Sequence, residues 1–360
     1  MTPKTNVRII DIARMAEVSV GTVDRVLHNR GHVSENKRIR VEKVLKEIGY
    51  KPNMVARVLA SKKKYTFAAI IPTFTPGSYW ELVREGINRG LDELSKFNIN
   101  IRYFYFDQHD KQSFIDTSKE LLKKDFDGII IATLMGEHVI ELSQTLDAGE
   151  IPYIYIDSNI SGQNNYAYFG GDSSASGQVA AKLLLNEIGH DASIFFAHIK
   201  LTYSEISVQM KARETGFMQY MQENGYKNKV YHLELDPDNA EESVTRLEAF
   251  LREQNEMLQI GGIVLNSRTY ELVKLLEMVD PALCKKVKLI GHDAIDSNTE
   301  PLKEGKITYL LSQRPGEQGY NALMALGNYR LFNETISKDN YMPIDILIKE
   351  NVDYYNNHKS

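Results

Sequence analysis

Residues 20 to 28 place small and polar side chains on one side of a short helix. Apolar residues at helical spacing between them would pack inward. An arginine fork can donate two hydrogen bonds to a guanine edge, and small neighbours let a helix enter a major groove. The pattern therefore favours contact with base edges of double-stranded DNA. The side chains expected to project outward are Val20, Gly21, Thr22, Asp24, Arg25 and His28.

Two short helices joined by a tight turn must position this surface. Ile9, Ile12, Ala13 and Ala16 recur at helical spacing and predict the apolar face of a first helix. Ser19 follows the break in that pattern and can cap the second helix. The arrangement is that of a helix-turn-helix.

A third helix completes this small domain. Ser34 can cap its start and Gly49 can end it. Its apolar stripe at i, i+3, i+4 and i+7 predicts one buried face, although three short helices bury little surface. The stripe consists of Val41, Val44, Leu45 and Ile48.

Charge separates this head from the rest of the chain. Residues 1–64 hold 15 Lys and Arg against 6 Asp and Glu, whereas the whole chain of 360 residues has a net charge of −5. A generic helical hairpin is the competing interpretation of the head. The basic excess on an otherwise acidic chain favours nucleic-acid binding instead.

Composition limits the other classes. The chain is 42% hydrophobic and 25% charged, as in globular proteins, and it is long enough for two or three domains. Its one cysteine, Cys284, gives no support for an oxidising compartment. The first residues have no apolar signal region, and no run of 18 apolar residues occurs. We therefore expect a cytoplasmic protein without a membrane span.

A hinge is expected after the third helix. Pro52 prevents that helix from continuing, and Asn53 can cap a short helix from Met54 to Ala60. Lys62, Lys63 and Lys64 then form a basic linker. Either this is a solvated connector, or it is a hinge helix that orders on DNA and inserts Leu59 as a wedge into the minor groove.

From Phe67 onward, short apolar runs alternate with helical stretches. This alternation predicts parallel sheets covered by helices on both faces, and nine strands suit two doubly wound lobes better than one sheet. The expected strands span residues 67–71, 101–106, 128–132, 153–157, 193–198, 229–235, 261–266, 287–293 and 307–313.

Polar side chains follow several of these strands. Asp157, Asn266, Asp293 and Gln313 stand at carboxyl ends, where ligands bind in such sheets. Carboxylates and amides can hydrogen-bond vicinal hydroxyls, and aromatic faces can cover a sugar ring. Turn chemistry would explain any one of these residues, but four such ends favour a sugar site. The loop after the first strand adds the aromatic candidates Phe74, Tyr79 and Trp80.

Two other classes are disfavoured. A pure solute-binding protein would need an export signal and no basic head. An enzyme would need catalytic motifs, and the nucleophile-elbow, zinc-protease, P-loop and dinucleotide patterns are absent from the sequence. His292 and Asp293 are adjacent strand residues that face opposite sides, so they do not form a catalytic pair. We expect no enzyme activity, no cofactor and no metal site.

The chain resembles the lactose-repressor (LacI) family of bacterial transcription regulators over its whole length. The stretch IIDIARMAEVSVGTVDRVLHNRGHVSENKRIRVEKVLKEIGYKPNMVARVLASKK carries the most specific part of the resemblance. It implies an all-α helix-turn-helix head, and a body of two doubly wound parallel-sheet lobes like that of type I periplasmic binding proteins. By position, Val20, Gly21 and Arg25 match the major-groove readers. Ser19, Thr22 and Asn29 match phosphate contacts, and Leu59 matches the minor-groove leucine.

The resemblance also implies a ligand site and a mode of action. Asp157, Arg213, Asn266, Asp293 and Gln313 fall where relatives contact ligand, and Phe74, Tyr79 and Trp80 would stack on it. The implied protein is a homodimeric repressor that binds operator DNA. Its affinity is controlled by a small effector, a mono- or disaccharide or a derivative, held between the lobes. The sequence leaves open the effector, the operator, induction or co-repression, and dimer or tetramer.

Domain boundaries follow from these expectations. We expect the head at 1–51, the hinge at 52–65, an N-lobe at 66–163 with 295–316, and a C-lobe at 164–294 with 317–360. Glu17 stands where the family commonly has glycine, and Asp24 replaces a usual serine. Gly21 lies inside the recognition helix, where it costs about 1 kcal/mol relative to alanine.

Overall fold

A computed structural model describes residues 7–27, 30–50, 54–61, 63–200, 207–254 and 256–355. The chain forms two compact units, Met1–Lys62 and Lys63–Ser360, each of which is described by itself. Within the described residues, no helix is both long and apolar enough to cross a bilayer.

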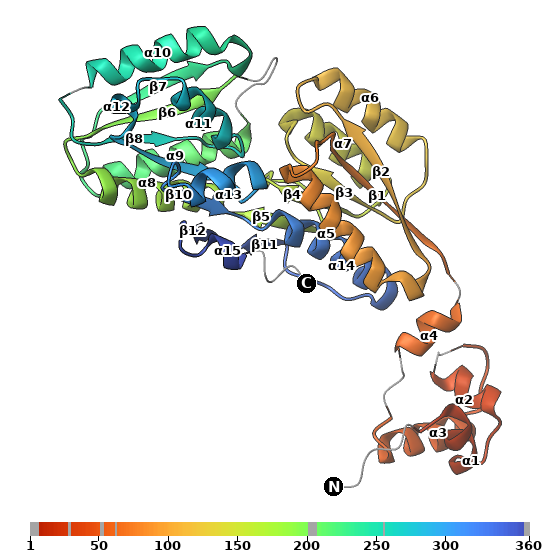
Figure 1. Ribbon diagram of the computed structural model, residues 1–360. Helices are drawn as coiled ribbons and strands as arrows, with labels where there is room; N and C mark the ends of the chain where they lie inside the picture. Colours follow the sequence, from red (N-terminus) through yellow and green to blue (C-terminus); the bar gives the residue numbers. More distant parts are fainter. Residues whose placement is uncertain are drawn as a thin grey trace. The chain divides into compact units, whose positions relative to one another are not determined.

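The first unit contains the three helices expected for the head (Figure 1). They are α1 (Ile9–Met15), α2 (Val20–Leu27) and α3 (Glu35–Glu47), and they contact one another around a small core. A separate helix, α4 (Met54–Ser61), matches the expected hinge helix. The core consists of Ile12, Ala13, Ala16, Val23, Val41 and Val44.

Local signals set the ends of these helices. The Ser19 hydroxyl accepts a hydrogen bond of 3.2 Å from the Thr22 backbone N–H, which confirms the expected cap of α2. Gly49 has φ +60° directly after α3, as a left-handed stop requires. Ser34 lies at the expected N-cap, but among the described residues its hydroxyl makes no cap hydrogen bond.

The second unit consists of two lobes, each built on a six-stranded sheet (Figure 1). The first sheet has the order β11-β5-β4-β3-β1-β2, and every neighbouring pair is parallel. Helices α5 and α14 cover one face and pack on each other, while α6 and α7 lie on the other. Its elements are β1 (Tyr65–Pro72), α5 (Tyr79–Glu93), η1 (Ser95–Phe97), β2 (Ile99–Phe106), α6 (Lys111–Leu122), β3 (Gly128–Ala132), α7 (Gly136–Ala148), β4 (Tyr153–Asp157), β5 (Ala167–Gly171), α14 (Pro315–Phe332) and β11 (Asp339–Met342).

The second sheet has the order β12-β10-β9-β8-β6-β7 and is parallel except for the β10–β12 pair. One hydrophobic cluster joins it to α8 and α9, and another joins it to α10, α11 and α13. Its elements are α8 (Ser173–Ile188), β6 (Ser193–Ile199), α9 (Val208–Glu223), β7 (Val230–Leu235), η2 (Pro237–Asn239), α10 (Ala240–Glu253), β8 (Ile260–Ile263), α11 (Thr269–Glu277), α12 (Pro281–Cys284), β9 (Val287–His292), α13 (Asp296–Lys303), β10 (Tyr309–Ser312), β12 (Asp345–Leu347) and α15 (Val352–Tyr355).

The expected lobe boundaries, 66–163 with 295–316 and 164–294 with 317–360, are wrong. Strand β5 pairs with β4 in the first sheet, and β11 and α14 belong to the same lobe. Conversely, β10 pairs with β9 in the second sheet, and α13 packs on α11. The chain therefore changes lobe after β5, β10 and β11. These changes of lobe are not evident from the sequence because β5 and β11 are short and β11 is polar, so neither gives a strand signal.

Glycines let α8 and α9 touch through their backbones. A Cβ atom on Gly177 would lie 1.9 Å from the carbonyl oxygen of Arg213, and one on Gly216 would lie 2.0 Å from that of Ser174. Such distances forbid any larger residue unless the helices separate. This contact fixes the position of Arg213 on α9.

Candidate functional site

The exposed side of α2 is the candidate DNA-reading surface. Val20 is 45% exposed, and Gly21 and Arg25 are also exposed, as expected. Thr22 was expected to project outward, but it is 8% exposed, and its hydroxyl lies 2.9 Å from that of Ser19. The short Thr22 side chain completes the turn instead of standing free of it. Asn29, expected to contact phosphate, lies outside the described residues.

The turn before α2 has a left-handed residue. Glu17 has φ +54°, which is the conformation that glycine adopts at least cost. Its carboxylate lies 3.6 Å from the Arg40 guanidinium on α3, although both side chains are largely exposed. The backbone turn that glycine usually makes is therefore retained with a glutamate.

Helix α4 presents an apolar side chain to solvent. Leu59 is 45% exposed, and Val55, one turn earlier, is 41% exposed. The eight-residue helix is too short to be stable by itself in water. Its exposed leucine is available for a partner, which is the property a minor-groove wedge needs.

In the body, residues from both lobes meet in one buried polar network. Asp157, at the end of β4, accepts a hydrogen bond of 3.0 Å from Gln209 on α9 of the second lobe. The Asp157 backbone N–H donates to Gln318 on α14 at 3.1 Å, and the Gln318 amide donates to the carbonyl of Gln313 at 3.0 Å. The Gln313 amide in turn lies 3.5 Å from the Asp293 carboxylate. We call these five residues the interlobe network.

Two members of the interlobe network have strained backbones. Asp157 has φ +78° and is the last residue of β4, and Asp293 has φ +68° and directly follows β9; both strands are central in their sheets. Non-glycine residues in this region are uncommon and cluster at functional sites. Both turns direct a carboxylate into the space between the lobes.

Arg213 supplies the positive charge beside these carboxylates. It is 2% exposed, and its Nη1 donates to the Leu265 carbonyl at 2.6 Å. Among the described residues its Nε has no hydrogen-bond partner. A buried guanidinium N–H without a partner is costly, so this group is suited to donate to a bound molecule.

Burial sets the protonation of the carboxyl groups. Desolvation raises the pKa of Asp293 to about 6, while Arg213 opposes that shift and Asp157 adds to it. Burial also raises the pKa of Asp157, again opposed by Arg213. The pKa of the Tyr79 hydroxyl is raised well above its usual value by burial, with Asp157 and Asp293 adding to the shift. Tyr79 is therefore a neutral donor beside two acceptors.

His292 lies next to this network but faces other partners. Its Nδ1 is 2.8 Å from the Val264 carbonyl, which can only accept, so Nδ1 carries the proton. Its Nε2 therefore accepts from the Ser176 hydroxyl at 3.3 Å. Burial holds the pKa of His292 well below its usual value, so the ring is neutral and structural.

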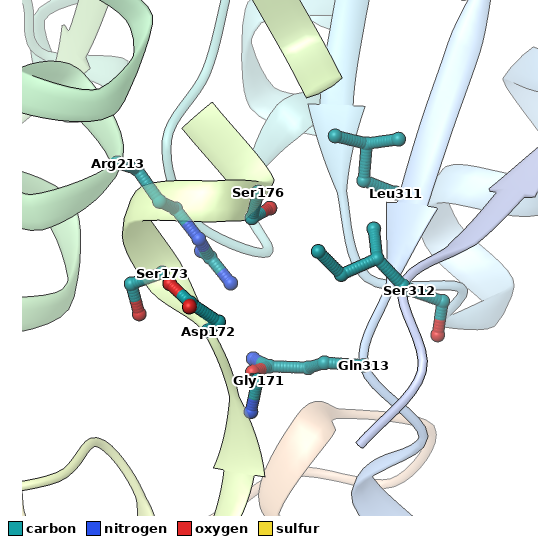
Figure 2. A pocket seen from close by; sticks show the side chains of 9 residues that line it. Gly171, Asp172, Ser173, Ser176, Arg213, Leu311, Ser312 and Gln313 are labelled. Atoms are coloured by element: carbon teal, nitrogen blue, oxygen red, sulfur yellow. Dashed lines mark hydrogen bonds between the residues drawn. The ribbon is translucent and has the colours of Figure 1, made fainter. Parts of the chain in front are cut away.

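A pocket opens where the chain crosses between the lobes. Figure 2 shows the Arg213 guanidinium pointing toward Asp172, Ser176 and Gln313. The cavity volume of this pocket is only about 10 Å³, far below the 300–1,000 Å³ typical of ligand pockets. An effector therefore needs the lobes to separate or the network to give way. The lining residues are Gly171, Asp172, Ser173, Ser176, Arg213, Leu311, Ser312, Gln313 and Ile344.

Three expected ligand residues are placed differently. The Phe74 ring packs edge-on against Tyr105 and under the Arg84 guanidinium. Asn266 accepts from the Arg268 backbone N–H at 3.0 Å, which is turn chemistry. Trp80 is 6% exposed and reaches the site only through its edge-on contact with Tyr79, whose hydroxyl is 3.4 Å from Gln318.

Gln209 and Gln318 were not among the expected site residues. Both are buried glutamines on helices, 8% and 0% exposed. A glutamine on a helix is ordinarily a surface residue, so neither carried a signal. The structure brings them beside the expected residues Tyr79, Asp157, Arg213, Asp293 and Gln313.

Each of the two units of the chain matches a known protein family. Residues 67–332 match the periplasmic binding protein domain, and residues 8–53 match bacterial regulatory proteins of the lacI family. Catabolite control protein A of Streptococcus mutans is 32% identical over 182 residues, which is 46% of this chain and 52% of the relative. The Priestia megaterium protein of that name is 36% identical over 143 residues, 39% of this chain and 41% of the relative. The alignments span about half the length of these relatives.

Solved structures share the fold of the body. A structure assigned as a LacI transcriptional regulator from Bacteroides fragilis has a TM-score of 0.75 and 35% identity, covering 81% of this chain and 100% of that one. The glucose-galactose binding protein GanP from Geobacillus stearothermophilus has a TM-score of 0.66 and 18% sequence identity, and the match covers 80% of this chain and 98% of that one. An Agrobacterium vitis solute-binding protein with bound tagatopyranose has a TM-score of 0.65 and 22% sequence identity, and the match covers 80% of this chain and 96% of that one.

Proposed function

Because the chain belongs to the periplasmic binding protein domain family and carries a lacI-family head, we propose that it is a transcription regulator whose operator affinity is controlled by a small effector. The observation that carries this proposal is the junction of Asp157 with Gln209. This hydrogen bond joins a side chain of the first lobe directly to a side chain of the second lobe. A molecule that replaces this bond changes how the lobes are held together, and such a change can be passed to DNA affinity.

The chemistry of the site favours a sugar or another polyol. Asp157 and Asp293 offer carboxylate oxygens, while Arg213 and Tyr79 offer buried donors. Adjacent hydroxyl groups both donate and accept, so they satisfy such a mixed set. The sugars in the names of the structural neighbours support the same class, a mono- or disaccharide or a derivative. Among the described residues at this site, the carboxylates Asp157 and Asp293 outnumber the one guanidinium of Arg213, which disfavours a strongly acidic effector.

On DNA, the exposed side of α2 would read the major groove. Arg25 is its long cationic side chain, with Val20 and Gly21 leaving room for the base edges. Ser19 and Asn29 would hold phosphates, and Leu59 of α4 would enter the minor groove. Thr22, buried beneath Ser19, would act by fixing that serine.

The proposed assembly is a homodimer in the cytoplasm that represses transcription. Two heads on a two-fold axis match the two half-sites of a pseudo-palindromic operator. A single head of about 50 residues offers few contacts, so dimerisation would supply the rest of the affinity.

The test combines an operator selection with a sugar screen on the full chain. Selected DNA should contain a pseudo-palindrome, and Arg25→Ala should relax the preference at one base pair per half-site. In thermal-shift screening, an effector present at 100 times its Kd should stabilise the protein by about 2.7 kcal/mol. That effector should also change operator affinity. The proposal would be refuted if the selection yielded no preferred DNA sequence, or if a stabilising sugar had no effect on operator binding.

A further inference from the structure

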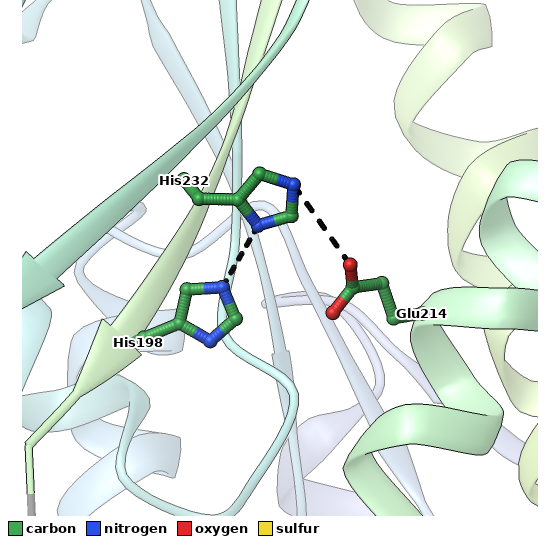
Figure 3. Close-up of side chains that lie close together, drawn as sticks. All are labelled: His198, Glu214 and His232. Carbon is green, nitrogen blue, oxygen red and sulfur yellow. Dashed lines mark hydrogen bonds and ion pairs between the residues drawn. The ribbon is translucent and has the colours of Figure 1, made fainter. Parts of the chain in front are cut away.

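Two histidines and a glutamate meet on the second lobe, away from the interlobe network. His198 lies on β6 and His232 on the neighbouring parallel strand β7, while Glu214 lies on α9 (Figure 3). Phe196 and His198 are two residues apart on β6, so their side chains lie on the same face of the sheet. The strand register pairs Phe196 with His232 of β7. The two histidines therefore stand on the sheet face that α9 covers.

The distances within this cluster suit a metal ion. The Nε2 of His198 lies 2.9 Å from the Nδ1 of His232, and the Nε2 of His232 lies 3.8 Å from a Glu214 carboxylate oxygen. One ligand atom from each residue lies within 4.8 Å of the others, and within the described part of the chain this is the one such group. Two ligands around tetrahedral zinc at 2.0–2.1 Å are about 3.3 Å apart, so a small opening of the pair would admit the ion.

The donor set identifies the class of ion. Two imidazoles and one carboxylate are ligands that zinc and neighbouring divalent transition metals accept, whereas magnesium and calcium prefer oxygen ligands alone. The hydrogen bond between His198 and His232 needs one proton between the two nitrogens. An ion would replace that proton and use both lone pairs.

The surroundings hold the ligands in place and leave an entry. His198 is 8% exposed, and the Phe196 ring stacks on His232 with centroids 5.4 Å apart. The His232 side chain is 48% exposed, so an ion can reach it from solvent. In the described structure, the one ion pair of Glu214 is with His232, so no lysine or arginine competes for its carboxylate.

From this geometry we propose that His198, Glu214 and His232 bind one divalent transition-metal ion of the zinc class. The ion ties α9 to the β6–β7 edge of the second sheet, and solvent takes its fourth position. Glu214 follows Arg213 directly on α9, so the site lies on the helix that also supplies Gln209 to the interlobe network. The proposal does not depend on the identity of the effector.

Cobalt titration of the full chain tests the proposal. Untagged protein treated with EDTA is titrated with Co²⁺, whose visible absorption reports tetrahedral or five-coordinate binding, and Zn²⁺ is then added in competition. We expect saturation at one equivalent and displacement by one equivalent of Zn²⁺. His232→Gln and Glu214→Gln should each weaken binding at least about tenfold.

His190→Gln is the matched control, because His190 is an exposed histidine of the same lobe that stacks on Tyr226. It should bind Co²⁺ as the wild type does. Circular dichroism shows whether each variant folds, and His232→Gln and Glu214→Gln alter partly exposed side chains. No saturable binding by the wild type, or unchanged binding by both folded ligand variants, would show that the cluster is only a hydrogen-bonded trio.

Discussion

The Asp157 carboxylate of the first lobe accepts a 3.0 Å hydrogen bond from the Gln209 amide of the second lobe. Both side chains are buried, at 4% and 8% exposure. The protein thus uses its own amide to satisfy an acceptor that a ligand hydroxyl would otherwise satisfy. Effector binding must exchange this internal bond for bonds to the ligand, so the exchange can change the lobe arrangement at a modest net free energy.

Asp293→Ala should abolish the effector response and leave operator binding intact. Asp293 is a buried acceptor within reach of Gln313, whereas the head is a separate compact unit. The measurement is operator affinity, by fluorescence anisotropy, with and without the sugar that most stabilises the wild type. Asp191→Ala changes an exposed carboxylate of the same lobe and should respond normally. A normal response in Asp293→Ala would remove Asp293 from the site.

Effector affinity should rise with pH across about pH 6. Below that value Asp293 is protonated, since its folded pKa is about 6, and a protonated carboxyl is a poorer acceptor for hydroxyls. Isothermal titration calorimetry between pH 5 and pH 7.5 should show the midpoint of this rise in effector affinity. Asp293→Asn carries no titrating group there, and it should flatten the profile.

The stability of the effector-free protein should show the opposite trend. A carboxyl whose folded pKa exceeds the unfolded value of 3.8 holds its proton more tightly when folded. Its contribution is full below about pH 3.8 and is lost as the pH rises through about 6, a change on the order of 3 kcal/mol. The difference in unfolding free energy between wild type and Asp293→Asn should therefore vary over this range. A constant difference would contradict the assigned pKa.

Gly177→Ala should weaken effector binding and lower thermal stability together. The added Cβ would lie 1.9 Å from the Arg213 carbonyl oxygen, so α9 must move and carry the Arg213 guanidinium with it. We expect a loss of about 1–3 kcal/mol in unfolding free energy. Gly136→Ala is the control, because its nearest new contact is an ordinary 3.6 Å. Wild-type effector affinity in Gly177→Ala would show that Arg213 does not contact the effector.

Glu17→Gly should stabilise the head. Glycine removes the strain of the left-handed residue, φ +54°, which costs about 1 kcal/mol or more. The lost ion pair with Arg40 is exposed and contributes little. Glu17→Ala loses the ion pair but keeps the strain, so it separates the two effects. In the full chain, the head should unfold at a higher temperature in Glu17→Gly than in the wild type or in Glu17→Ala.

Leu59→Ala should reduce affinity for the selected operator and leave binding to random DNA nearly unchanged. Leu59 is 45% exposed on a short helix, so the folded head loses little when it is truncated. A wedge that kinks DNA contributes through the sequence it deforms, while basic residues hold phosphates on any sequence. Salt titrations on both DNAs give the comparison. Equal losses on both would show that Leu59 does not act as a wedge.

Short-range patterns in the sequence were enough to predict the local elements. The spacing of Ile12, Ala13 and Ala16 marked the buried face of α1, and Ser19 and Gly49 marked helix ends that the structure confirms. The nine expected strands are all present, because buried parallel strands read as continuous apolar runs. Such signals arise within a few residues of one another, so no knowledge of distant contacts is needed to see them.

Which distant residues meet depends on the tertiary structure. It assigned β5 and α14 to the first lobe and β10 to the second, because strand pairing depends on partners far along the chain. It brought Gln209 and Gln318 to Asp157, and it used Asn266 for a turn. It also placed Glu214 beside His198 and His232, three residues for which the sequence had predicted no metal site. The crossing of α8 and α9 at Gly177 and Gly216 positions the helix that carries Gln209 and Glu214, and such a crossing depends on how whole elements pack.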